Sequence, residues 1–172
     1  QIRVPSAAKA KPLVEKLPDA DWVVMSQQAL KPVHAGRFYV HTGSNKGKIP
    51  KGARPFLIEA SRAFGTGGHE TTSGCLMMLD TMKRAGKRFE VIADIGTGTG
   101  LLAFAAHRLW PKAYLTASDI DPVSVDVTAD NARVNNVPCG VAQGQLALCE
   151  AEGTAHPLIA SRAPYDLVTA NI

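Results

Sequence analysis

Between about residue 70 and residue 170, the sequence alternates short apolar runs with longer segments of helical periodicity. The apolar runs predict strands over residues 90–95, 114–118, 140–142 and 166–170. Helical spacing, with Gly86 and Pro111 as stop signals, predicts helices over residues 71–85, 100–110 and 122–135. Strands that alternate with helices of this length form βαβ units, whose parallel sheet carries helices on both faces. The sequence therefore predicts an α/β, Rossmann-like fold.

The part of the chain before this alternation is less regular. Residues 1–20 mix prolines with charged residues, which indicates a linker or the remnant of a preceding domain, and residues 21–172 form the predicted α/β domain. Three further strand-like runs precede the alternation: Trp22–Met25, Phe38–Val40 and Arg54–Glu59. The first two fit two short strands or a strand and a turn. The chain ends at Ile172, directly after a predicted strand, so we expect the sheet to be C-terminally incomplete.

The run D-I-G-T-G-T-G, residues 94–100, lies where a predicted strand turns into a predicted helix. Glycines at such a turn allow positive φ values and a close approach of backbone to ligand. A dinucleotide-binding turn needs G-x-G-x-x-G, but Leu101 stands at the third glycine position, which disfavours a nicotinamide-dependent oxidoreductase. G-x-G-x-G with an acid two residues ahead is typical of S-adenosylmethionine enzymes. The predicted cofactor contacts in this run are Asp94, Gly96, Gly98 and Gly100.

Asp119 ends the next predicted strand. An acid at this place can accept hydrogen bonds from both hydroxyls of a ribose. The alternative role is a cap for the following helix, but Asp121, directly before Pro122, is better placed to cap it. We therefore predict that Asp119 binds the ribose and that Asp121 caps the helix.

A second glycine-rich run, Phe64–Thr72, leads into the first predicted helix. It fits either a flexible turn with a threonine cap or a second wall of the same site. In the second case, threonine hydroxyls and backbone N–H groups contact the carboxylate of the methionine part. His69 suits a structural hydrogen bond at least as well as proton transfer, so no general base is assigned.

Asn171 follows the last predicted strand, at the carboxyl edge where open parallel sheets bind their ligands. Its side-chain oxygen could hold an attacking amine in line with a sulfonium methyl group. On position alone, a polar residue in an exposed loop fits equally well.

The net charge of +4 is unevenly distributed along the chain. Residues 1–60 hold ten Lys and Arg against four Asp and Glu. This surplus fits attraction to an anionic partner such as RNA or a ribosomal surface. Taken alone, it fits a solvated basic tail more simply.

Cysteines and histidines form no recognisable ligand pattern. The three cysteines lack C-x-x-C spacing and the five histidines are scattered singly, so the sequence predicts neither a disulfide framework nor a metal site. It also contains neither an apolar run long enough for a bilayer nor a secretory signal. We expect a cytoplasmic protein without a membrane partner, and its oligomeric state stays open.

These motifs together resemble those of the PrmA-type methyltransferases, a bacterial family that methylates ribosomal protein eleven of the large subunit. The similar segments are AFGTGGHETT (Ala63–Thr72), DIGTGTG (Asp94–Gly100), SDIDP (Ser118–Pro122), DNARVNN (Asp130–Asn136) and DLVTANI (Asp166–Ile172). Glu59–Arg62 departs from the family's D-P-G-x, which has little bearing on cofactor binding.

The resemblance implies S-adenosylmethionine as the cofactor, with contacts at Thr72, Gly96, Asp119 and Asn171. It also implies an N-methyltransferase that acts on lysine and N-terminal amines of a large-subunit ribosomal protein, gripped by a separate N-terminal domain. Asn171 is the expected catalytic residue, because it would orient the acceptor amine. Two alternatives stay open: a cofactor-binding module without turnover, and a methyltransferase with another protein or small-molecule acceptor.

Overall fold

The computed structural model describes residues 31–58 and 69–172 of the chain. Its main sheet has four parallel strands in the order β6-β5-β4-β7. The strands are β4 (Val91–Ile95), β5 (Tyr114–Asp119), β6 (Leu146–Glu150) and β7 (Leu167–Ala170). Because all four run in the same direction, the carboxyl ends of β4, β5 and β7 lie at one edge, which we call the carboxyl edge.

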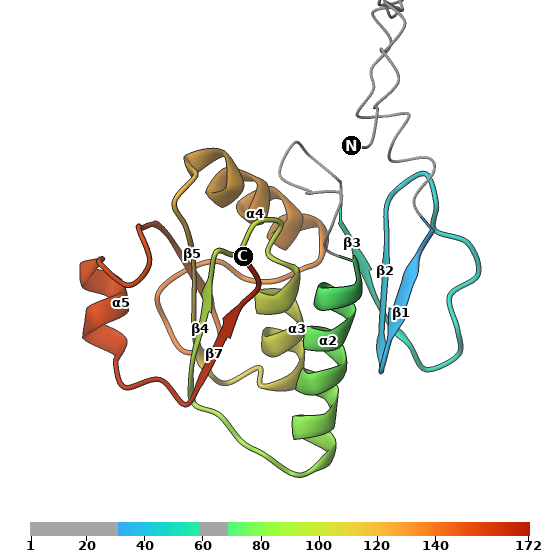
Figure 1. The fold of residues 1–172 in the computed structure, drawn as a ribbon, viewed down its shortest axis with the longest axis horizontal. Coiled ribbons are helices and arrows are strands. Elements are labelled where there is room, and N and C mark those ends of the chain that lie inside the picture. The colour runs from blue at the N-terminus through green and yellow to red at the C-terminus, as the bar shows by residue number, and fades with distance from the viewer. Residues whose placement is uncertain (1–30, 59–68) are drawn as a thin grey trace, which may run out of the picture.

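Helices cover both faces of this sheet (Figure 1). One face carries α2 (His69–Arg84), α3 (Leu101–Leu109) and α4 (Pro122–Val134), and the other carries α5 (Pro157–Arg162). As predicted, α2 stops at Gly86, where φ is +76° and the N–H donates to Lys83 O. The α/β, Rossmann-like fold with a parallel sheet covered on both faces is confirmed.

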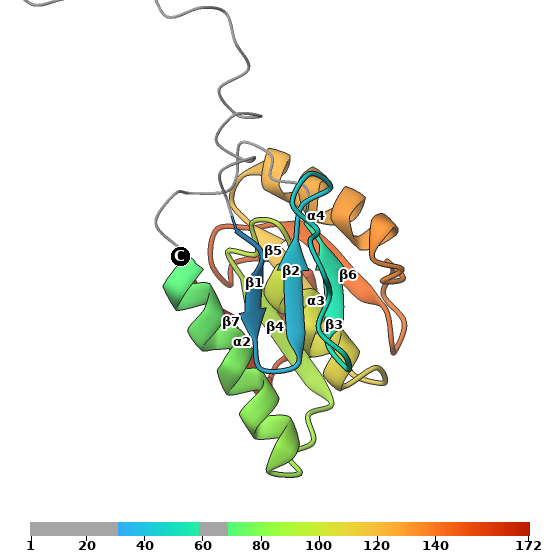
Figure 2. The same cartoon turned by 90° about the vertical axis from the view of Figure 1, so that its right-hand side faces the viewer.

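A second sheet lies against the outer side of the helix layer (Figure 2). Its strands are β1 (Val33–Ala35), β2 (Phe38–His41) and β3 (Arg54–Leu57). β1 and β2 form an antiparallel hairpin, and β3 pairs in parallel with β2. The sequence predicts β2 and β3 but not β1, and the predicted run Trp22–Met25 lies outside the described residues. Helix α3 therefore lies between the two sheets, and α2 and α4 flank it.

A continuous apolar core joins the two sheets through the helix layer. Phe38 of β2 stacks on Phe56 of β3, and Phe56 packs against Phe104 of α3 with ring centroids 6.4 Å apart. Residues 101–106 of α3 are all buried, and the same core reaches Ile92 in β4. Each large apolar side chain that is fully buried contributes about 1.5–3 kcal/mol. This burial fixes the position of α3, and with it the turn that precedes the helix.

The strand predicted at residues 140–142 is wrong, because β6 begins only at Leu146. Residues 140–145 form a turn in which φ is +152° at Gly140 and +80° at Gly144. The side chain of Gln145 accepts a hydrogen bond from the N–H of Ala142 at 3.1 Å. The apolar residues in this turn therefore do not belong to a strand. Helix α5 is also absent from the prediction, since six residues are too few for a helical period to stand out.

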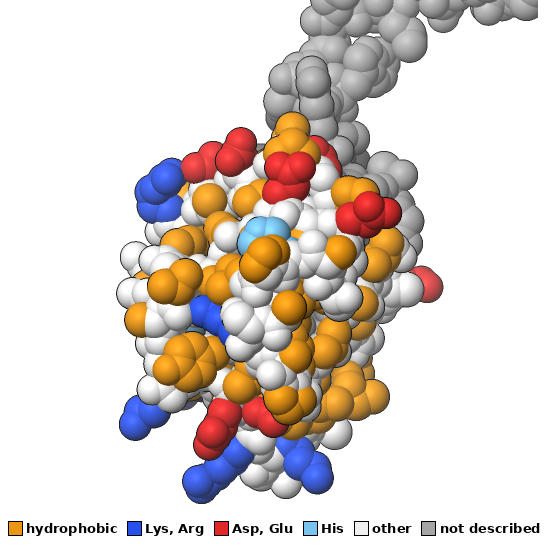
Figure 3. Space-filling model, turned by 90° about the vertical axis from the view of Figure 1, so that its left-hand side faces the viewer, with side chains coloured by type: hydrophobic (Ala, Val, Ile, Leu, Met, Phe, Trp, Pro, Cys, Tyr) orange, Lys and Arg blue, Asp and Glu red, His pale blue; other side chains and the backbone are white. Residues whose placement is uncertain are grey.

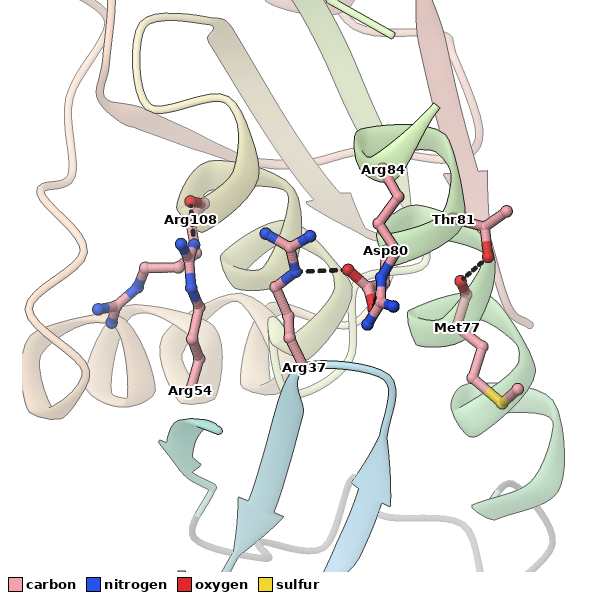
Figure 4. A network of polar contacts seen from close by, with 7 residues as sticks. All are labelled: Arg37, Arg54, Met77, Asp80, Thr81, Arg84 and Arg108. Carbon is pink, nitrogen blue, oxygen red and sulfur yellow. Dashed lines mark hydrogen bonds and ion pairs between the residues drawn. The ribbon is translucent and has the colours of Figure 1, made fainter. Parts of the chain in front are cut away.

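An ion-pair network holds the end of the helix layer that lies away from the carboxyl edge (Figure 4). Asp80 of α2 is buried and accepts hydrogen bonds from Arg37, in the turn between β1 and β2, and from Arg84 Nε at 3.0 Å. A Cβ added at Gly36 would lie 2.6 Å from Asp80 Oδ2, so only glycine allows this approach. We call Arg37, Asp80 and Arg84 the arginine clamp. It fastens the β1–β2 hairpin to α2.

Helix α5 covers only part of its face of the main sheet. A small cluster of Cys149, Ala151 and Ile159 lies beneath it, apart from the main core. Arg162 of α5 donates to Leu115 O at 3.0 Å and to Thr116 Oγ1 at 2.8 Å. Figure 3 shows apolar side chains spread over this face. Polar contacts from Arg162 therefore supplement a thin apolar contact in holding α5.

Candidate functional site

The glycine loop, residues 96–100, joins β4 to α3 at the carboxyl edge. Its three glycines all have positive φ: +69° at Gly96, +55° at Gly98 and +85° at Gly100. Side chains with a Cβ rarely adopt such values, which explains the repeated glycine. The N–H of Thr97 donates to Ser118 O at 2.9 Å and so ties the loop to β5.

The space around the three glycines differs. A Cβ added at Gly96 would lie 2.8 Å from Ile172 Cγ1, and one added at Gly100 would lie 2.8 Å from Thr128 Cγ2. A Cβ at Gly98 would meet nothing within 4 Å among the described residues. Gly100 is therefore required by the packing of buried side chains around it, whereas the open side of Gly98 lets a ligand approach the backbone.

Asp119 lies at the end of β5, next to the glycine loop. Its Oδ2 accepts from the N–H of Gly98 at 2.9 Å and its Oδ1 from the N–H of Asp121 at 3.1 Å. Asp121 is the N-cap of α4, with its side chain accepting from the N–H of Val123, so the predicted cap is confirmed and Asp119 does not fill that role. Asp119 is partly exposed and sits where a ligand on the loop would meet it.

Asp94 of β4 lies beneath the glycine loop and is 1% exposed. Thr97 Oγ1 donates to its Oδ2 at 2.7 Å, and Thr169 Oγ1 of β7 donates to its Oδ1 at 2.6 Å. Burial raises the pKa of Asp94, although hydrogen bonds from the two threonine hydroxyls and from the backbone of Ala103 act against the rise. The sequence predicts Asp94 as a cofactor contact. The structure places both of its oxygens on hydroxyls of the protein, so the residue shapes the loop from below.

Helix α4 carries a row of buried polar residues that sequence reasoning missed, and two of them hold the loop from the side. The row consists of Ser124, Thr128, Asn131 and the helix-ending Asn135. Thr128 Oγ1 donates to Gly98 O at 2.9 Å, and Asn131 Nδ2 donates to Thr99 O at 3.0 Å. The signal in the sequence is polar residues at helical spacing, a pattern that is normally read as a solvated face.

Thr72 and Asn171, predicted from opposite ends of the domain, meet at the carboxyl edge. Asn171 Nδ2 donates to Thr72 Oγ1 at 3.0 Å, which joins the end of β7 to the first turns of α2. A Cβ at Gly96 would come within 2.8 Å of the neighbouring Ile172 side chain, so this pair lies beside the glycine loop. Residues 64–68 of the predicted second loop, and the side chain of His69, lie outside the described residues.

Neither a metal centre nor a membrane span is visible in residues 31–58 and 69–172. No three His, Cys, Asp or Glu side chains in these ranges gather in a way that could hold a metal ion. No helix there is both long and apolar enough to cross a bilayer.

Comparison with known proteins adds independent findings. The sequence model of the family described as "Ribosomal protein L11 methyltransferase (PrmA)" matches residues 2–172. A protein of that name from Mesorhizobium japonicum is 46% identical over 166 residues, which cover 96% of this chain and 55% of the relative. One from Brucella suis is 44% identical over 158 residues, covering 92% and 53%. The chain thus spans about half the length of the curated relatives it matches.

Among solved structures, a crystal structure described as a ribosomal protein L11 methylase from Lactobacillus delbrueckii subsp. bulgaricus is similar to this chain. It has a TM-score of 0.60 and 26% sequence identity, and the match covers 83% of this chain and 67% of that one. The similarity agrees with the parallel sheet and the helix layer described above.

Proposed function

The chain belongs to the ribosomal protein L11 methyltransferase (PrmA) family, and from this premise we propose that it forms the cofactor-binding part of an S-adenosylmethionine-dependent protein methyltransferase. The observation that carries the proposal is the meeting of three features at the carboxyl edge. These features are the glycine loop, the Asp119 carboxylate and the Thr72–Asn171 pair. Together they offer an approachable backbone, an acid for hydroxyls and a polar pair for an amino acid group.

The residues at this edge fit S-adenosylmethionine. The open side of Gly98 admits a nucleoside against the backbone, and the partly exposed carboxylate of Asp119 suits two ribose hydroxyls. Thr72 stands in the first turns of α2, where the hydroxyl and the helix N-terminus favour a carboxylate. Gly96 and Gly100 hold the shape of the loop that brings these groups together.

Bound S-adenosylmethionine supplies a methyl group already activated by a sulfonium, so transfer to an amine depends mainly on alignment. Asn171 orients the acceptor, because its side-chain oxygen can accept a hydrogen bond from the attacking nitrogen. That bond strengthens as positive charge grows on the nitrogen. A lysine, with an ordinary pKa of about 10.4, must first lose its proton, and a desolvated site favours the neutral amine.

The names of the relatives support ribosomal protein L11 as the acceptor. Its lysine and N-terminal amines are the groups that we propose are modified. The positive charge concentrated in residues 1–60 suits an encounter near an anionic ribosomal or RNA surface. Because such a substrate is made in the cytoplasm, we propose the same location for this protein.

Incubation of the protein at its natural full length with a labelled methyl donor and a ribosomal extract tests the proposal. We expect label on a single large-subunit protein, and loss of that label in Asn171→Ala. Donor binding without labelling would favour a module that has no turnover. Label on a different protein or on a small molecule would replace the proposed acceptor.

A further inference from the structure

One buried carboxyl connects the strand that carries Asn171 to the glycine loop. Asp94 and Thr169 are register partners on β4 and β7, and Thr169 Oγ1 donates to Asp94 Oδ1 at 2.6 Å. The other oxygen of Asp94 accepts from Thr97 Oγ1, within the loop, at 2.7 Å. Asn171 lies two residues after Thr169, so this carboxyl is a side-chain link between the loop and the strand that carries Asn171.

The link is not needed for the pairing of the two strands. The backbones of β4 and β7 already pair from Ile92–Leu167 to Ile95–Ala170. Burying a carboxyl under α3 costs free energy that an apolar pair at the same register would avoid. The two hydrogen bonds through Asp94 fix the distance between the loop and the end of β7. Both bonds are short and lie away from water, which strengthens them.

The loop also has a second tether that does not involve β7. Thr128 and Asn131 of α4 bind the carbonyls of Gly98 and Thr99. The shape of the loop therefore has support of its own, and the Asp94–Thr169 bond adds a side-chain link between the loop and β7 to the backbone pairing that ends at Ile95 and Ala170.

We propose that Asp94 and Thr169 are positioning residues, which hold Asn171 in register with the glycine loop so that the acceptor amine meets the methyl group. This inference rests on the proposed function. The bond acts through Asn171 and not on the ligand, so its loss affects turnover more than cofactor affinity.

The test compares three variants of the full-length protein: Thr169→Val, Thr169→Ser and Thr116→Val. Thr169→Val keeps the volume and removes the hydroxyl, whereas Thr169→Ser restores the hydroxyl. Thr116→Val is the matched control, because Thr116 is a buried threonine of β5 whose hydroxyl accepts from Arg162, on the α5 side of the sheet. We measure kcat with saturating donor, KM for the acceptor and Kd for S-adenosylhomocysteine.

We expect Thr169→Val to lower kcat about tenfold, which is near 1.4 kcal/mol in the barrier, with Kd for S-adenosylhomocysteine changed less than about threefold. Thr169→Ser should restore kcat, and Thr116→Val should leave it unchanged. Equal loss of kcat in Thr169→Val and Thr116→Val would overturn the proposal, as would a Thr169→Ser variant no better than Thr169→Val.

Amide hydrogen exchange without ligand provides a readout that is independent of turnover. In Thr169→Val, the amide of Thr97, which donates to Ser118 O, should exchange faster than in the parent, while Thr116→Val leaves it unchanged. Unchanged exchange at the Thr97 amide would overturn the link even if the parent proved inactive. Absence of donor binding and labelling in the parent, by contrast, contradicts the proposed function itself.

Discussion

Two aspartates, Asp80 of α2 and Asp94 of β4, are buried, and different partners satisfy their carboxyl groups. Asp80 is 3% exposed and lies between two arginines, whereas Asp94 is 1% exposed and lies between two threonines. Burial would raise the pKa of Asp80, but Arg84 and Arg37 outweigh it and hold this pKa below the ordinary value. At Asp94 no such charge compensates, and burial leaves the pKa raised.

The difference shows that burial of an acid does not by itself indicate its role, and that the partners of the carboxyl group do. In the arginine clamp, two arginines neutralise Asp80 and fasten a hairpin to α2. The clamp therefore has a structural role. Asp94 instead binds neutral hydroxyls from the glycine loop and from β7, two elements whose ends meet at the candidate site. Structural ion pairs and functional sites both shift pKa values, and here the geometry separates them.

Removal of the clamp should produce the largest change in stability. We expect Asp80→Ala to lower the free energy of unfolding by about 2–4 kcal/mol, because it leaves Arg37 partly buried and unpaired. The loss stays below that of a fully buried pair, since the Arg84 side chain is 66% exposed. Urea denaturation measures the change, and Kd for S-adenosylhomocysteine should not change.

Asp130→Ala is the matched control for the clamp. Asp130 also pairs with an arginine one turn further along its helix, Arg133, but both of these side chains are more than 70% exposed. Its loss should change stability by less than about 0.5 kcal/mol. Comparable effects at Asp80 and Asp130 would show that the clamp does not hold the fold.

Asp94→Asn should have a smaller effect on stability than loss of the clamp. An amide can accept from one threonine and donate to the other, so we expect a loss of about 1–2 kcal/mol. Unlike Asp80→Ala, this change should also alter the site, and we expect kcat with saturating donor to fall. An Asp94→Asn variant that has normal kcat, or that is less stable than Asp80→Ala, would contradict the different roles assigned to the two acids.

The pH dependence of unfolding should show opposite signs for the two acids. The pKa of Asp80 is lowered in the folded state, so its stabilisation is present above the unfolded value of about 3.9 and is lost as pH falls below it. The pKa of Asp94 is raised, so stability falls as pH rises from that unfolded value through the folded one.

Unfolding free energies measured from acid to neutral pH in Asp80→Asn and Asp94→Asn separate these two contributions. Asp80→Asn should lose less stability toward acid pH than the parent. Asp94→Asn should lose less stability as pH rises above the unfolded value. Identical pH profiles in the two variants would mean that both acids behave alike.

The parallel sheet could be predicted from the sequence because its signals are local. The bounds of β4, α3, β5, α4 and β7 lie within one or two residues of the prediction. The strand predicted at residues 140–142 was wrong, because the positive φ values of the glycines that form a turn there produce no periodic pattern in the sequence. The place of Asn171 at the carboxyl edge follows from strand direction, since parallel strands end at one edge. Thr72 is named only from the resemblance, and its hydrogen bond with Asn171 was not predicted.

The supporting residues of the site could not be predicted. Thr128 and Asn131 have the spacing of a solvated helix face, and only the packing of α4 against the loop buries them. Thr169 reads as an ordinary strand residue until its register opposite Asp94 is known. The direct contact of Asp94 with a cofactor stays a prediction.

The central claim, that the glycine loop and Asp119 form a nucleoside site, is tested most directly by calorimetry of S-adenosylhomocysteine on the full-length protein. Asp119→Ala should weaken binding by roughly 1.5–3 kcal/mol, about ten- to a hundredfold. Asp121→Ala removes the neighbouring cap of α4 and should cost about 1 kcal/mol of stability with affinity retained. An Asp119→Ala variant that binds as tightly as the parent would contradict the account.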